Sequence, residues 1–177
     1  HLMLHHSVRI HRGEAFNITA DLSALPLVQA LLRETRRIGA LAQVEWTHQS
    51  VTRQILELYD PDDPATTAFL EDKAQTGIRK YQNLVANINI RAYENDQELN
   101  GIKPAVRQLD ARLAKPFRDL LINRRRWVLF EYPTPGQAQS SSFFNSIWVM
   151  RLAFTAPTPS NTLIRSTAFP ASFPASM

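Results

Sequence analysis

The stretch AFNITADLSALPLVQALLRETRRIGALAQVEW, residues 15–46, decides the fold of this chain. Its first six residues are typical of a short apolar strand, and Asp21 and Ser23 then offer caps for a helix that begins near Leu25. Apolar residues recur at helical spacing until Gly39, and a second strand, ALAQVEW, follows directly. A strand, a helix and a second strand in this order predict one βαβ unit, in which a right-handed crossover joins parallel strands.

The chain continues this alternation of strands and helices as far as residue 132. Helices are expected at 50–59, at 65–81 and at 103–123, the last as one or two helices around Pro116, and strands at 83–93 and 127–132. The last of these strands is apolar throughout, which is typical of a strand covered on both faces. The predicted fold class is therefore α/β, a layered domain with a mostly parallel central sheet flanked by helices.

The two ends of the chain differ in composition from this domain, which we place at residues 8–139. Residues 1–7, HLMLHHS, hold three histidines but no other metal-ligating residue type nearby, so we interpret them as a tag remnant or a ragged N-terminus. Residues 140–177 contain no acidic residue and repeat Pro, Ser, Ala and Thr. We expect a disordered or opportunistically packed tail there, from a truncated or frame-shifted gene or, alternatively, a natural low-complexity segment.

Composition excludes several classes of protein. The 177 residues include no Cys, no apolar run of membrane-spanning length and no signal-peptide core, which predicts a cytoplasmic protein without a membrane span. The net charge is +4, but only +2 of it falls within residues 1–131. Nucleic-acid binding is therefore disfavoured, and it is kept as a weaker hypothesis that would use the arginines at 107, 112, 118 and 124–126.

The residues that carry chemistry do not add up to a self-sufficient active site. The chain has no GxGxxG loop and no GxSxG nucleophile elbow, and the acidic cluster at 60–63 lacks the EF-hand pattern. His48 follows the second strand at its carboxyl end, where ligands of α/β proteins bind, although a surface histidine is the simpler interpretation. We therefore expect no catalytic residue and no metal ligand in this chain.

Five short segments nevertheless follow one another in a specific order. They are NITAD with LPLV at 17–28, RE and GA between 33 and 40, INIRAYEN at 88–95, LNGIKP at 99–104, and RW with YPTP and AQ between 126 and 139. In sequence and spacing they resemble the N-terminal domain of the thermophilic metallo-aminopeptidases of the aminopeptidase T and aminopeptidase S group. The resemblance extends from about residue 8 to residue 139.

The resemblance implies an enzyme that releases N-terminal residues from peptides with two divalent metals, zinc, cobalt or magnesium. The metal ligands of that family belong to a C-terminal domain that this chain does not contain, so the chain is expected to be inactive in isolation. The exposed domain interface is expected to cause self-association, for example as a dimer. The family-motif residues expected at this interface are Arg126, Trp127, Tyr132, Pro133, Thr134 and Gln139.

An alternative hypothesis does not depend on the missing domain. The chain would then be a stand-alone α/β module that binds a small ligand or a peptide in the crevice at the carboxyl ends of its strands.

Overall fold

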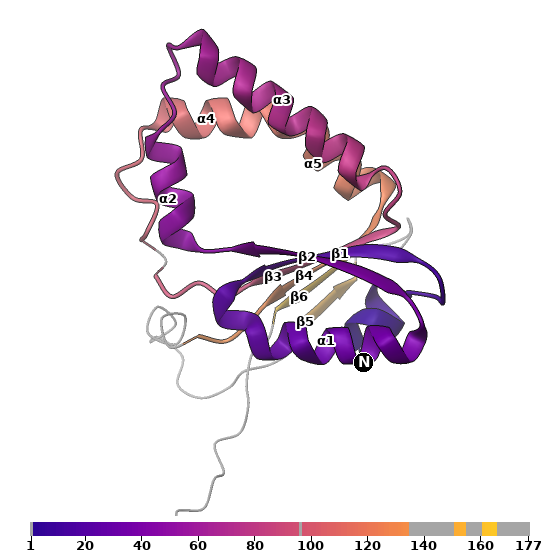
Figure 1. Ribbon diagram of the computed structural model, residues 1–177. Helices are drawn as coiled ribbons and strands as arrows, with labels where there is room; N and C mark the ends of the chain where they lie inside the picture. Colours follow the sequence, from indigo (N-terminus) through magenta and orange to yellow (C-terminus); the bar gives the residue numbers. More distant parts are fainter. Residues whose placement is uncertain (1, 96, 135–150, 155–160, 166–177) are drawn as a thin grey trace, which may run out of the picture.

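A computed structural model of the chain describes residues 2–95, 97–134, 151–154 and 161–165. Helices and strands alternate through most of this range (Figure 1). In chain order the elements are η1 (Met3–Ser7), β1 (Ala15–Asp21), η2 (Leu22–Ala24), α1 (Leu25–Ile38), β2 (Leu41–Thr47), α2 (Gln49–Glu57), α3 (Pro64–Tyr81), β3 (Ala86–Arg91), α4 (Pro104–Leu113), α5 (Lys115–Arg124), β4 (Arg126–Glu131), β5 (Arg151–Phe154) and β6 (Asn161–Arg165).

The βαβ unit predicted from residues 15–46 is confirmed. Strands β1 and β2 pair in parallel, and α1 connects them. The side chain of Asp21 accepts a hydrogen bond from the Ser23 backbone N–H at 3.2 Å, which caps η2 just before α1. Gly39 ends α1 with a φ of 75°, a conformation in which a side chain would be strained.

The central sheet confirms the predicted α/β fold class. Its first four strands lie in the order β2-β1-β3-β4 and are parallel throughout. The segment expected as one or two helices forms two, α4 and α5, and Pro116 lies in the first turn of α5. A proline there removes no helical hydrogen bond, so the helix can begin at the preceding residue.

Two further strands correct the expectation that residues 127–132 form the last strand. β6 pairs in parallel with β4, and β5 pairs antiparallel with β6. Both lie within the segment expected as a low-complexity tail. Backbone pairing with an open sheet edge uses N–H and C=O groups that every non-proline residue carries, so it does not require an alternating side-chain pattern. The rest of the 140–177 segment lies outside the described residues.

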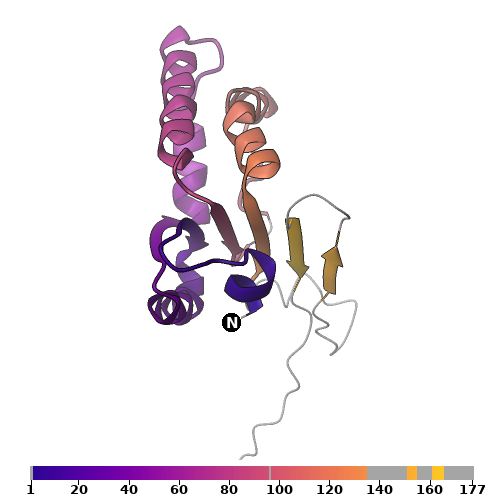
Figure 2. The same cartoon turned by 90° about the vertical axis from the view of Figure 1, so that its right-hand side faces the viewer.

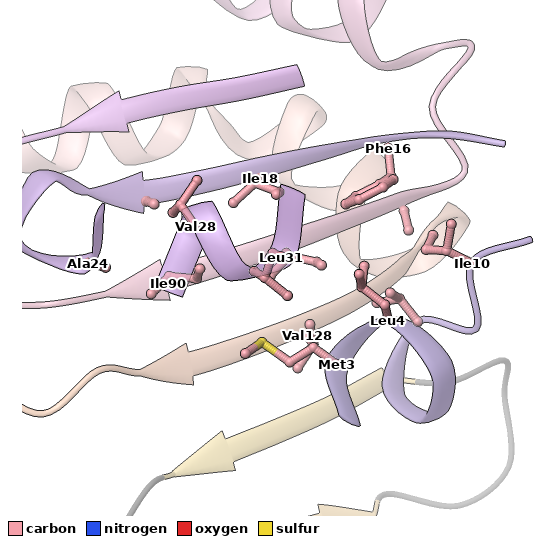
Figure 3. Packing of buried hydrophobic residues seen from close by; sticks show 14 of the residues in the cluster. Met3, Leu4, Ile10, Phe16, Ile18, Ala24, Val28, Leu31, Ile90 and Val128 are labelled. Carbon is pink, nitrogen blue, oxygen red and sulfur yellow. The ribbon is translucent and has the colours of Figure 1, made fainter. Parts of the chain in front are cut away.

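One face of the sheet is apolar and is covered by η1 and α1. The fully buried side chains of Phe16, Ile18 and Val128 project from this face toward α1 and η1 (Figure 3). Leu4 of η1 is also fully buried, and Met3 is 8% exposed. The apolar side chains of residues 2–4 thus lose contact with water by packing on the sheet, and the interpretation of residues 1–7 as a tag remnant or a ragged N-terminus stays a prediction.

The opposite face of the sheet is polar and lies toward α2, α3, α4 and α5 (Figures 1 and 2). Asn17 and Asn87 project from it and are buried. On β4, which was expected to be covered on both faces, Val128 is buried and the other five residues are half-buried. The two faces of this sheet therefore differ in chemistry, whereas parallel sheets are usually apolar on both.

Candidate functional site

A crevice of about 500 Å³ opens at the carboxyl ends of β1, β2 and β3. We call it the carboxyl-end crevice. Its polar lining includes Thr19, Asp21, His48, Asn89 and Arg91, and Tyr93 and Leu99 add apolar surface. The volume lies within the usual range for small-molecule sites, and the position is the one at which open α/β sheets bind ligands.

The start of α2 and the loop after β3 form the walls of the carboxyl-end crevice, and hydrogen bonds hold them together. The Gln49 side chain accepts from the backbone N–H groups of Glu94 at 3.0 Å and Asn95 at 3.2 Å. It also donates to the Asn95 carbonyl at 2.9 Å. Arg53 donates to the Glu98 carbonyl at 2.8 Å. These bonds fix both walls without using the side chains that line the floor.

Asp21 and Arg91 bring opposite charges to the floor of the carboxyl-end crevice. Ala20 pairs with Ile90 in the β1–β3 register, so the next residues, Asp21 and Arg91, end neighbouring strands. Asp21 is only 4% exposed, yet within the described residues no Lys, Arg or His lies within 4.0 Å of its carboxylate. Both charges are therefore available to a bound molecule.

His48 is the N-cap residue of α2 and lies directly after β2. Its Nδ1 is 2.8 Å from the Ser50 hydroxyl, and it caps α2 with its backbone rather than its side chain. A serine and a histidine at this distance could form part of a hydrolytic site. In the part of the chain that the structure describes, no carboxylate hydrogen-bonds to the His48 ring, so the third member of such a site is missing.

A row of polar side chains crosses the polar face of the sheet. Gln43, Asn17, Asn87 and Trp127 are register partners on successive strands, and we call them the polar row. Asn17 donates to Asn87 at 2.9 Å and to the Thr19 hydroxyl at 2.8 Å. Asn17 Oδ1, Gln43 Nε2 and Trp127 Nε1 are buried and have no hydrogen-bond partner among the described residues. Groups of this kind are usually satisfied by buried water.

Glu45 connects the polar row to the helices above it. Tyr81 of α3 donates to Glu45 at 2.8 Å, and Lys80 forms a short ion pair with the same carboxylate. Burial, together with the hydrogen bond to Glu45, raises the pKa of Tyr81 well above its ordinary range. Tyr81 therefore stays protonated and keeps donating this bond at neutral pH.

The family-motif residues do not form one patch. Arg126 and Trp127 open β4 at the amino-terminal edge of the sheet, far along the strand from the carboxyl-end crevice. Tyr132, Pro133 and Thr134 follow the other end of the same strand. Gln139 lies outside the described residues.

Arg126 joins two segments of the chain at the amino-terminal edge of the sheet. It donates to the Arg9 carbonyl at 2.5 Å and to the Glu14 carboxylate at 2.8 Å. Burial alone would raise the pKa of Glu14, but the hydrogen bonds from Arg126 and from the His11 backbone outweigh it and lower that pKa. Arg126 thus joins β4 to the segment between η1 and β1.

The residues after β4 support the loop of the carboxyl-end crevice. The Tyr132 backbone N–H donates to the Arg91 carbonyl at 2.7 Å, and the Thr134 hydroxyl donates to the Tyr93 carbonyl. Thr134 is 5% exposed. These family-motif residues therefore hold the backbone of Arg91 and Tyr93 in place.

The divalent metals implied by the resemblance do not fit the described residues. No group of three or more His, Asp and Glu side chains within residues 2–95, 97–134, 151–154 and 161–165 could hold a metal ion. Across these same residues, no helix has both the length and the apolar character needed to cross a membrane.

Sequence reasoning placed His48 at the carboxyl end of the second strand but favoured a surface histidine, and it assigned no site role to Asp21, Asn89 and Arg91. A usable signal was present in the strands. Polar residues occupy alternate positions in β3, at Asn87, Asn89 and Arg91, so they share one face. Those nearest the carboxyl end of a parallel strand are the ones expected at a ligand site.

Comparisons with known proteins identify relatives of this chain. The chain is similar in structure to wild-type AmpT from Thermus thermophilus, with a TM-score of 0.54 and 20% sequence identity. The likeness covers 76% of this chain and 35% of AmpT, and at this identity it supports the fold alone. No curated protein matches the chain. Residues 1–146 match the family described as thermophilic metalloprotease (M29). The chain therefore belongs to the M29 family of thermophilic metalloproteases.

Proposed function

We propose that this chain is the N-terminal α/β domain of a metal-dependent aminopeptidase and that it is inactive in isolation. The complete enzyme would release N-terminal residues from peptides with two divalent metals. The family match over residues 1–146 supports the class of enzyme. The proposed inactivity rests on one observation, that the described residues contain no cluster able to hold a metal.

The role of this domain in the complete enzyme would be to shape the substrate cleft and to form an interface with the catalytic domain. Tyr132, Pro133 and Thr134 are the proposed link, because they hold the crevice loop and lead out of the sheet. Two prolines around Thr134 restrict the direction in which the chain leaves. Arg126 and Trp127 would contribute indirectly, by anchoring β4.

Self-association belongs to the same proposal. Val51 and Ile55 of α2 and Leu58 at its C-cap follow one another at helical spacing and are 52%, 40% and 79% exposed. An apolar helix face of this kind is typical of a surface that another domain or a second copy covers. Sedimentation equilibrium of the chain should show a dimer that Leu58→Glu dissociates, and a monomer at all concentrations would contradict this part.

An activity assay with a metal count tests the main proposal. Purified chain is incubated with leucine p-nitroanilide in the presence of zinc, cobalt or magnesium. We expect no turnover and no stoichiometric bound metal, because the described residues hold no cluster of metal-ligating side chains. Metal-dependent turnover that persists through further purification and is lost in His48→Ala would contradict the proposal. The same assay with Ser50→Ala would then test whether the His48–Ser50 contact is involved.

A second candidate function is small-ligand binding in the carboxyl-end crevice, which the unpaired buried carboxylate of Asp21 favours. Nucleic-acid binding through the arginines at 107, 112, 118 and 124–126 remains the weaker hypothesis. Arg125 and Arg126 donate to backbone carbonyls and so are less available to phosphates. A cytoplasmic location likewise stays a prediction.

A further inference from the structure

The floor of the carboxyl-end crevice presents two opposite charges that are not joined in an ion pair. Asp21 and Arg91 end neighbouring strands, and strands in a sheet lie about 4.8 Å apart. No ion pair within 4.0 Å joins the two side chains. Arg91 instead lies 6.0 Å from the centre of the Tyr93 ring. A carboxylate and a guanidinium so placed can each bind one end of a small molecule with both charges.

Asp21 is held in position to accept a cationic group. Its Oδ1 accepts from the Ser23 backbone N–H at 3.2 Å, which helps to fix the side chain, and among the described residues no further donor hydrogen-bonds to this carboxylate. The residue is 4% exposed, and a buried carboxylate without a cationic partner is costly. An ammonium group in the carboxyl-end crevice would supply the missing partner.

Arg91 offers the positive charge that would bind the anionic group of a ligand. Arg91 lines the carboxyl-end crevice from β3, and His48 lines it from the opposite wall. α2 begins at this wall with no acidic residue in its first turn and no side-chain cap. The strand order β2-β1-β3 puts this helix N-terminus on the side of Asp21 away from Arg91, so Arg91 alone is assigned to the anionic group of the ligand.

Apolar and neutral polar groups fill the remainder of the lining. Tyr93 and Leu99 come from the loop that hydrogen bonds of Gln49 join to α2. Thr19 and Asn89 offer hydroxyl and amide groups two residues before Asp21 and Arg91 on the same strands. The volume of about 500 Å³ is larger than one small amino acid requires, so an apolar side chain can be accommodated.

We propose that the carboxyl-end crevice binds an α-ammonium carboxylate with an apolar side chain, that is, a free apolar amino acid or a short apolar peptide. Asp21 binds the ammonium group, Arg91 binds the carboxylate, and Tyr93 and Leu99 contact the side chain. This inference rests on the second candidate function, small-ligand binding, and it does not require the chain to be catalytically active.

Titration calorimetry of the whole chain with four probes tests the inference. L-leucine carries both charges, leucine amide carries only the ammonium, and 4-methylpentanoate carries only the carboxylate. We expect both single-charge compounds to bind about 10- to 100-fold more weakly than leucine, since each loses one charge-assisted interaction. The dipeptide Leu-Gly, as the fourth probe, distinguishes a free amino acid from a peptide as the source of the ligand.

Two variants assign the charges to residues. Asp21→Asn keeps a helix-capping side chain but removes the charge, so it should weaken leucine and leucine amide and leave 4-methylpentanoate unchanged. Arg91→Met should weaken leucine and 4-methylpentanoate and leave leucine amide unchanged. Matched controls are Asp63→Asn, which alters the capping aspartate of α3, and Arg107→Met on the exposed surface of α4. Neither control should change any affinity.

Each outcome has a definite meaning. If leucine and one of its single-charge analogues bind equally well, and a crevice variant abolishes this binding, the crevice binds a small ligand but does not require both charges. That result would overturn the inference and support the second candidate function. Binding that survives both crevice variants would place the ligand elsewhere and overturn the inference. No binding of any probe would overturn the inference and remove the support for the second candidate function. The proposed aminopeptidase domain is tested separately, by the turnover and metal count.

Discussion

The two faces of the sheet differ in chemistry and in their role in this domain. On the face toward η1 and α1, Phe16, Ile18 and Ile88 are fully buried among apolar neighbours. On the opposite face, the neighbouring positions carry Asn17, Thr19 and Asn89. The first face excludes water and stabilises the fold. The second holds hydrogen-bonding groups and two unpaired charges toward the carboxyl-end crevice.

The chemical difference between the two faces indicates that residues needed for stability and residues available for binding lie on different sides of the sheet. Parallel sheets are usually apolar on both faces, because helices cover both. Here helices lie over both faces, yet only one face is apolar, so the polar one carries groups that the fold itself does not require. Substitutions on the two faces should therefore have different consequences.

The largest expected effect comes from adjacent residues of β3 that project to opposite faces. Ile88→Ala should lower the free energy of unfolding by about 2–5 kcal/mol, because it leaves a cavity in the apolar core. Asn89→Ala should change it by no more than about 0.5 kcal/mol, because Asn89 is half-buried and packs in no core. Urea unfolding measures both values. Losses of similar size would show that the polar face is also needed for the fold.

The sequence predicted the first face better than the second. Apolar residues at helical and alternating spacing located α1, β1, β2 and β3, because burial against one core imposes those periods. The same alternation placed Asn87, Asn89 and Arg91 on one side of a strand. It could not reveal that Asp21, at the end of another strand, comes beside Arg91, because strand order is a long-range property.

The two ends of the chain were harder to predict. Met3 and Leu4 pack on the sheet although histidines surround them, since two apolar side chains suffice to cover an exposed part of the core. β5 and β6 follow no alternating pattern and pair through the backbone. The role of Tyr132 and Thr134 at the domain interface stays a prediction.

A smaller change in the free energy of unfolding is expected from a substitution next to the polar face. Tyr81→Phe removes the hydrogen bond to Glu45 and should lower the free energy of unfolding by about 0.5–1.5 kcal/mol at pH 7. Burial and Glu45 raise the pKa of Tyr81 above its ordinary value of about 10. The folded chain thus keeps a proton that the unfolded chain releases above pH 10.

The sign of the pH dependence follows from this shift. The contribution of Tyr81 is fully present below pH 10 and is lost as the pH rises toward the raised pKa of the folded state. Wild type should therefore lose more stability than Tyr81→Phe between pH 9 and pH 11, as measured by urea unfolding at each pH. Tyr59→Phe, at a half-buried position in the loop after α2 where the hydroxyl contacts Lys73, is the control. Equal alkaline losses in wild type and Tyr81→Phe would contradict the prediction.

The smallest change in the free energy of unfolding is expected at the edge of the apolar face, where Arg126 contacts the segment between η1 and β1. Glu14→Gln removes the ion pair with Arg126 and should cost about 0.5–1 kcal/mol at pH 7, because the pair is only partly exposed, at 26% and 19% for the two side chains. Arg126 would still donate to the Arg9 carbonyl, so the fold should survive. The bonds from Arg126 and the His11 backbone overcome the opposing effect of burial and lower the pKa of Glu14 below its ordinary value of 4.5.

A group whose pKa is lowered on folding stabilises the folded state above its unfolded pKa. The difference between wild type and Glu14→Gln should therefore be complete above pH 4.5 and should shrink as the pH falls below that value. Thermal unfolding from pH 7 down to pH 3 measures it. Glu57→Gln removes an exposed helical ion pair with Arg53 and serves as the matched control, with a smaller effect expected. If the two variants behave alike, the ion pair of Arg126 with Glu14 contributes no more than a surface pair, and η1 is held mainly by its apolar packing and by the His5–Glu34 contact with α1.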